Sequence, residues 1–187
     1  DPKTNLRLWR DAGPRMKVQD VKIENQGERT VRVSVTAELH EMAGAKASWT
    51  YLVQGAGDVI VESTYQPGTE KRAMMPRFGT ELIASAGLEN FTWYGQGPVE
   101  TQSDRQFERI GVYRSTVEKE WVDYSRPQEN GNKTQVRWMA LTNAQGVGLL
   151  AVGDTPLSVS ARHYSKDDME SAGYTFQMKP HPQIYLN

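Results

Sequence analysis

Apolar and polar residues alternate along much of this chain. The clearest stretch is 28–40, in which every second residue from position 31 is apolar and the residues between them are polar. A period of two places the apolar side chains on one face of a strand, which is typical of a half-buried antiparallel sheet. The apolar face of this stretch consists of Val31, Val33, Val35, Ala37 and Leu39.

Turn residues separate this strand from its neighbours. Asn25-Gln26-Gly27 precedes it and predicts a hairpin with the strand before it. A second hairpin is predicted where alternation over 47–53 is followed by a Gly-rich turn and then by Val59 and Val61. Further strands are predicted at 72–84, 90–95, 109–118, 134–142, 147–153, 157–164 and 174–179.

Short helices are predicted near both ends of the chain. Asp1-Pro2 is typical of a helix start, and Leu6, Trp9 and Ala12 recur at helical spacing as far as Pro14.

A second helix is predicted within 165–173. Ser165 is its N-cap, Asp168 stands at the capping-box position and Gly173 ends it. Because about ten strands are joined by short turns, the fold class is all-β. We expect one large antiparallel β-sandwich with one or two short helices, forming a single domain over residues 1–187.

The composition of the chain argues against several classes of partner and site. The chain has 22 Lys and Arg against 23 Asp and Glu, for a net charge of −1, which argues against a nucleic-acid or anionic-membrane partner. No apolar run approaches the roughly 18 residues of a membrane span. The absence of Cys excludes disulfides and Cys-bound zinc, and the three His residues lack metal-ligand spacing. We therefore expect neither a metal site nor a cofactor in this chain.

The two ends suggest a piece of a longer protein. The chain opens with DPKTNLRLWR, without an initiator Met or a signal peptide, and it ends with HPQIYLN inside an alternating pattern. We expect a fragment cut from a longer chain. The compartment stays open between cytoplasm and periplasm.

Four segments carry motifs that occur in order. The first is DPKTNLRLWRDAG and the last is SARHYSKDDMESAGYTFQM. Between them lie two more segments: one contains a Met-Pro-Arg-x-Gly run followed by a Trp-x-Gly-x-Gly-Pro-x-Glu-x-x-x-Asp-Arg run, and the other contains a Tyr-x-x-Pro-x-Glu-Asn-Gly run. Their positions are Met75, Pro76, Arg77, Gly79, Trp93, Gly95, Gly97, Pro98, Glu100, Asp104, Arg105, Tyr124, Pro127, Glu129, Asn130 and Gly131.

Together these motifs resemble the large bacterial β-galactosidases of glycoside hydrolase family 2. The resemblance runs nearly from end to end and covers the family's C-terminal β-sandwich, the small chain or fifth domain. It implies a supersandwich similar in fold to the galactose mutarotases. Tyr94 and Thr101 depart from the family pattern, and the family's Gly-Gly-Asp-Asp-x-Trp segment, whose Trp stacks on the sugar, does not occur in the chain.

The resemblance also implies that the catalytic residues lie in a different domain from this one. Retaining glycosidases use two carboxylates about 5–5.5 Å apart. In this family both glutamates, together with divalent and monovalent cations, belong to a barrel domain. We therefore expect no catalytic residue here, and a domain that walls the active site and supports assembly. The implied partner is a β-galactoside substrate held by the barrel, in a bacterial homo-oligomer.

The motifs also supply candidate substrate-binding residues: Trp93, Glu100, Asp104, Arg105, Glu129, Asn130 and His163. Each has a structural alternative. The carboxylates lie near predicted turns, where they can support the fold. We expect Glu129 to be structural and to accept hydrogen bonds from turn amides, Arg126 or Arg137. Trp93 could stack on a sugar, as could Tyr94, Trp121 and Trp138, yet aromatic residues on strands are more often core.

A second class of function stays open, that of an independent galactose-binding or mutarotase-like unit. A mutarotase needs a His and a carboxylate that act on the ring oxygen and the anomeric hydroxyl. His163 is the only His within a motif, and the sequence ties no Glu to it. A barrel domain encoded upstream in the same gene would favour the interpretation as a C-terminal domain of a β-galactosidase.

Overall fold

The computed structural model describes residues 6–70 and 73–187. Its contacts divide the chain into two compact units, an N-terminal unit of Asp1–Gly79 and a C-terminal unit of Thr80–Asn187. That the whole chain is one domain stays a prediction.

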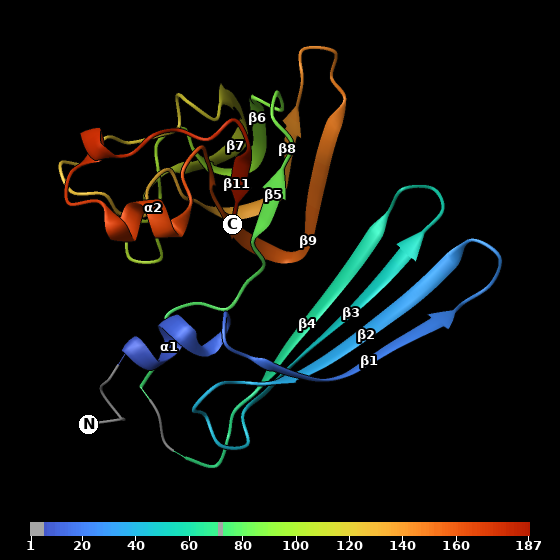
Figure 1. Ribbon diagram of the computed structural model, residues 1–187. Helices are drawn as coiled ribbons and strands as arrows, with labels where there is room; N and C mark the ends of the chain where they lie inside the picture. The colour runs from blue at the N-terminus through green and yellow to red at the C-terminus, as the bar shows by residue number, and fades with distance from the viewer. Residues whose placement is uncertain (1–5, 71–72) are drawn as a thin grey trace. The chain divides into compact units, whose positions relative to one another are not determined.

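The N-terminal unit contains a four-stranded antiparallel meander (Figure 1). Its strands are β1 (Lys17–Asn25), β2 (Thr30–Glu38), β3 (Lys46–Gln54) and β4 (Val59–Gln66), in the order β1-β2-β3-β4. Both hairpins predicted from the turn residues are confirmed. The register also follows the alternation, because Val35 pairs with Val21 on one side and with Trp49 on the other.

A small core closes one end of this unit. Helix α1 (Arg7–Ala12) confirms the described part of the first predicted helix, and its earlier residues lie outside the described ranges. Ala12 is buried with Met42 and Ala45. The indole of Trp9 donates to the carbonyl of Ala73 at 3.1 Å, which fixes the helix to the segment after the meander.

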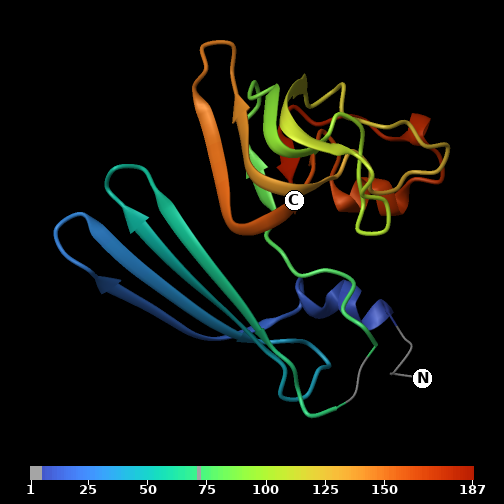
Figure 2. The ribbon, with the colours of Figure 1, turned by 180° about the vertical axis from the view of Figure 1, so that it is seen from behind.

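The C-terminal unit consists of two antiparallel sheets around one core (Figure 2). One sheet has the order β7-β6-β8-β9 and the other has the order β10-β11-β5. The bounds of the strands are β5 (Leu82–Ala84), β6 (Asn90–Gly97), β7 (Arg109–Thr116), β8 (Lys133–Thr142), β9 (Gly148–Val159), β10 (Ala161–Arg162) and β11 (Ile184–Leu186). The all-β fold class is confirmed.

Alternation explains this core as well. Phe91 and Trp93 lie two residues apart on β6 and pair with Leu141 and Met139 on β8, so all four side chains point the same way. All four are essentially inaccessible, and Ile184 of the second sheet joins them. The two sheets therefore bury a continuous layer between them, which is the arrangement of a sandwich.

Helix α2 (Lys166–Ser171) follows β10 and begins as expected. Ser165 Oγ accepts a hydrogen bond from the backbone N of Asp168 at 3.1 Å, and Asp168 Oδ2 accepts one from the Ser165 backbone N at 2.7 Å. This reciprocal pair is a capping box. Neither helix in the described ranges has the length and apolarity to cross a membrane.

Four predicted strands need correction. The segment 174–179 contains a 3-10 turn, η1 (Thr175–Gln177), because Gln177 Oε1 accepts hydrogen bonds from the backbone N of Gly173 and of Tyr174 and bends the chain. The strand expected at 72–84 is reduced, in its described part, to β5. The strands expected at 147–153 and 157–164 form one continuous strand, β9, followed by the short β10.

Candidate functional site: the Glu100 cluster

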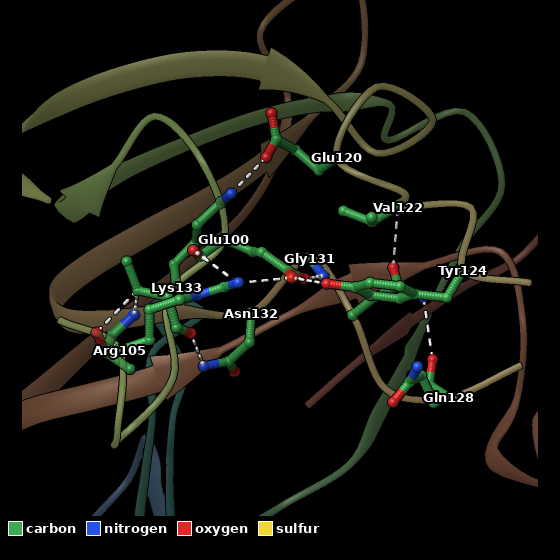
Figure 3. A network of polar contacts seen from close by, with 12 residues as sticks. Glu100, Arg105, Glu120, Val122, Tyr124, Gln128, Gly131, Asn132 and Lys133 are labelled. Carbon is green, nitrogen blue, oxygen red and sulfur yellow. Dashed lines mark hydrogen bonds and ion pairs between the residues drawn. The ribbon is translucent and has the colours of Figure 1, made fainter. Parts of the chain in front are cut away.

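Several motif residues meet in two loops of the C-terminal unit. The loop after β6 carries Glu100 and Arg105, and the long connection from β7 to β8 carries Tyr124 and Gly131 (Figure 3). We call these four residues the Glu100 cluster. They come from two of the family motifs, so the motifs encode a contact between distant parts of the chain.

Glu100 is the centre of this cluster, with its side chain only 10% exposed. Its Oε1 accepts hydrogen bonds from Arg105 Nη2 at 2.6 Å and from the Tyr124 hydroxyl. Its Oε2 accepts one from the Gly131 backbone N at 2.8 Å. Burial by itself opposes ionisation, but the bonds from Tyr124, Arg105 and Gly131 outweigh it and lower the pKa of Glu100.

The negative charge of Glu100 also shifts the pKa of the side chains that bind it. The hydrogen bond to Glu100 is the main cause that raises the pKa of Arg105, and it likewise raises the pKa of Tyr124. Each donor therefore keeps its proton more firmly beside the carboxylate. The cluster is held as an ionised carboxylate surrounded by three donors.

The turn at Asn130 and Gly131 is fixed from both sides. Gly131 has a φ of 67°, and a Cβ added there would lie 2.4 Å from the Glu120 carbonyl oxygen, so only glycine fits. Asn130 is 1% exposed. Its Oδ1 accepts from the Val122 backbone N at 3.1 Å, and its Nδ2 donates to the Gln128 carbonyl at 3.0 Å.

A second polar network ties the loop after β6 to β8. The hydroxyls of Thr101 and Thr134 are 2.8 Å apart, and the Thr134 backbone N donates to Thr101 Oγ1 at 2.9 Å. Gln96 Oε1 lies 2.7 Å from the Thr134 hydroxyl. Thr101, which departs from the motif of the family that the chain resembles, is fully buried, and its hydroxyl is hydrogen-bonded.

Lys133, the first residue of β8, is a buried cation. It is 1% exposed, and its Nζ lies 2.5 Å from Glu120 Oε2 and 3.0 Å from the Pro98 carbonyl oxygen. The same Nζ sits 4.8 Å from the centroid of a Trp93 ring, within range of a cation–π contact. A buried charge is tolerated when it is paired in this way.

A hollow of about 600 Å³ opens beside these groups. Its charged lining residues are Glu100, Arg105, Glu108, Lys119, Glu120 and Lys133, so acidic and basic side chains balance. Phe107 also lines the hollow and is 90% exposed. Four of these charges pair with one another, Glu100 with Arg105 and Glu120 with Lys133, so they hold the wall of the hollow together.

The other predicted residues near this region are placed differently. Trp93 is buried in the core, where its Nε1 donates to the Gln96 carbonyl at 2.9 Å and its rings stack on Tyr113. Asp104 is exposed in a tight turn closed by Gln102 and Arg105. Contact of either residue with a sugar stays a prediction.

Glu129 lies at an exposed position of the loop. The Gly131 amide, one of the donors we expected for it, is bound by Glu100 instead. Arg137, another expected donor, gives its Nη1 to the Gln135 carbonyl. The structural role of Glu129 stays a prediction, and the Gly131 amide of this turn is held by Glu100.

His163 belongs to a separate cluster at the end of β10. Its Nε2 lies 3.0 Å from Glu89 Oε2, and its Nδ1 lies 2.9 Å from the His181 carbonyl oxygen and 3.3 Å from that of Gln183. Both ring nitrogens of His163 thus face oxygen atoms of the protein. The pair with Glu89 fastens the end of β10 to the start of β6.

Sequence reasoning missed several members of these clusters. Tyr124 and Gly131 stand in a quoted motif, which was the available signal for them. Glu89, Glu120 and Lys133 carry no such signal, because their pairing depends on how distant loops meet. Among the described residues, no three His, Asp or Glu side chains gather closely enough to hold a metal ion.

Comparisons with known proteins agree with the motifs. Residues 1–187 match the family described as "Beta galactosidase small chain". The chain is 31% identical over 175 residues to a β-galactosidase of Lactobacillus delbrueckii subsp. bulgaricus, covering 93% of the chain and 17% of the relative. It is 32% identical over 183 residues to β-galactosidase BgaC of Bifidobacterium adolescentis, with coverage of 95% and 17%.

A β-galactosidase of Priestia megaterium is 30% identical over 173 residues, covering 92% of the chain and 16% of the relative. The chain thus spans about one sixth of the length of these relatives. The match over all 187 residues shows that the chain belongs to the β-galactosidase small-chain family.

Proposed function

We propose that the chain is the C-terminal β-sandwich of an enzyme that hydrolyses terminal β-D-galactosides. In this proposal the chain walls the active site and supports assembly of a homo-oligomer. The catalytic glutamates, and the divalent and monovalent cations that assist them, belong to a barrel elsewhere in the longer protein. The relatives are β-galactosidases, which supports the activity, and their lengths leave room for such a barrel.

The main support for a structural role of this chain is that both carboxylate oxygens of Glu100 accept hydrogen bonds. A glycosidase carboxylate must give a proton to the leaving oxygen or attack the sugar, and the acid form depends on a raised pKa. Glu100 instead has a lowered pKa and three donors on its two oxygens. It is therefore suited to holding two loops in place rather than to exchanging protons.

Hydrolysis of a chromogenic β-galactoside by the chain alone and by the full-length protein tests this proposal. We expect the full-length protein to turn over the substrate and the isolated chain, folded by circular dichroism, to show none. Turnover by the purified isolated chain that disappears with Glu100→Gln would contradict the proposal.

The pairing of His163 with Glu89 favours a second candidate, an independent galactose-binding or mutarotase-like unit. It supplies the His and the carboxylate that ring opening needs. Both nitrogens of His163 are already engaged, however, which leaves neither directed at a ligand. Sub-millimolar binding of galactose to the isolated chain by calorimetry, lost with Glu89→Gln, would support this candidate over the first.

A further inference from the structure

Asn130 and Gly131 form the only Asn-Gly pair in the sequence. In such a pair the backbone nitrogen of the glycine can attack the preceding side-chain amide, because glycine has no Cβ to hinder the approach. A bond forms between Gly131 N and Asn130 Cγ, the Cγ–Nδ2 bond breaks, and ammonia leaves. Water then opens the succinimide to Asp or isoaspartate, so one water is consumed for each ammonia released.

The fold requires both members of this labile pair. Any side chain at position 131 would meet the Glu120 carbonyl oxygen at 2.4 Å, with φ in the left-handed region. At position 130 one side chain must both accept from Val122 N and donate to the Gln128 carbonyl while fully buried. Asp would lack the donor, and an apolar residue would lack both groups.

The contacts that require the pair also restrain its reacting atoms. The Gly131 N–H donates to the Glu100 carboxylate, whose negative charge opposes loss of the proton that attack requires. The Asn130 amide cannot rotate without breaking both of its hydrogen bonds. Both residues are buried, which limits access of hydroxide and water.

We propose that Asn130 is a latent deamidation site that the Glu100 cluster keeps closed. Opening of the bond between Glu100 and Gly131 frees the nitrogen, and the succinimide then forms. The product carries a second carboxylate near Glu100 and has lost the donor to Gln128, so the loop does not close again. Deamidation at this position thereby turns a transient opening of the loop into a permanent change.

The test compares deamidation rates in the full-length protein at mildly alkaline pH. Mass spectrometry of the tryptic peptide 120–133, with isoaspartate analysis, follows the reaction at Asn130. Glu100→Ala removes every acceptor, so we expect the rate to rise by about tenfold or more over the unmodified protein. Glu100→Gln keeps one acceptor oxygen and should give an intermediate rate.

A matched control, Leu141→Val, destabilises the core of the same unit and leaves the cluster intact, so it should leave the rate near that of the unmodified protein. Equal rates in the unmodified protein and Glu100→Ala would overturn the proposal, as would an equal rise in the control. If Glu100→Ala does not fold, Glu100→Gln takes its place, because the amide is a weaker acceptor for the Gly131 N–H than the carboxylate. No increase in that variant would likewise overturn the proposal.

Discussion

The meander of the N-terminal unit and the Glu100 cluster of the C-terminal unit are held by different kinds of contact. Strands β1 to β4 pair with their sequence neighbours, and the alternation of each strand sets the register. In the Glu100 cluster, a side chain binds a backbone amide 31 residues away. Local pattern is enough to specify the first arrangement, whereas the second depends on the assembled fold.

The two units also differ in how completely their apolar strand faces are buried. Val21 and Ile23 lie on the apolar face of the meander but are 54% and 71% exposed. Phe91 and Trp93, at equivalent alternating positions of β6, are 0% and 1% exposed. An alternating pattern therefore predicts which residues share a face, but not how completely that face is covered.

The largest expected effect comes from the buried layer of the C-terminal unit. Met139→Ala removes a fully buried side chain, and we expect it to lower the free energy of unfolding by about 2–5 kcal/mol. Val21→Ala, at a half-exposed position of β1, should cost less than about 1 kcal/mol. Urea denaturation of the two variants measures this difference, and equal losses would contradict the contrast between the two faces.

Alanine substitutions at two glycines distinguish the cost of steric crowding from the cost of backbone strain. Gly131 and Gly146 both have positive φ, but an added Cβ meets the Glu120 carbonyl only at Gly131 and open space at Gly146. Gly146→Ala should cost about 1 kcal/mol from strain, and Gly131→Ala should cost about 2 kcal/mol more because the loop must also move. Similar losses in thermal unfolding would mean that Gly131 is not closely confined.

Acid unfolding tests the charge of Glu100. Its pKa lies below the ordinary value of 4.5 when folded, so its contribution to stability is present above that value and is lost as the pH falls through the folded pKa. Glu100→Gln should cost about 1.5–3 kcal/mol at neutral pH and progressively less in acid. Asp168, whose pKa is also lowered, provides a separate acid-sensitive contribution that the variant retains. A stability gap that does not change with pH would argue against an ionised Glu100.

The smallest effect is expected at Glu129. Because Glu129 is exposed, where contacts of a charged side chain are screened by solvent, Glu129→Gln should lower the free energy of unfolding by less than about 1 kcal/mol. Turnover in the full-length protein should stay within about tenfold of the unmodified protein. A loss of several orders of magnitude in turnover with unchanged stability would assign Glu129 a catalytic role.

Much of the fold could be predicted from local signals. The hairpin at Asn25-Gln26-Gly27 and the capping box of Ser165 and Asp168 both depend on residues a few positions apart, and both are confirmed. The strand predicted at 174–179 is wrong, because the side chain of Gln177 caps a turn that alternation alone does not reveal.

The site was only partly predictable. The motifs supplied Glu100, Arg105 and Asn130, but not the choice of Glu100 over Glu129 as partner of the Gly131 amide. That choice depends on how two loops meet, one at the C-terminal end of β6 and one at the N-terminal end of β8, which lie at the same end of the antiparallel pair. The buried pair of Glu120 and Lys133 depends on the same approach, and no spacing in the sequence indicates it.

The central claim is that Glu100 anchors two loops and does not take part in catalysis. Its most direct test measures turnover of a chromogenic β-galactoside and the thermal midpoint for Glu100→Gln in the full-length protein. We predict a lower midpoint, with kcat reduced by no more than about tenfold at a temperature where the variant is folded. A kcat reduced by several orders of magnitude with an unchanged midpoint would contradict the claim.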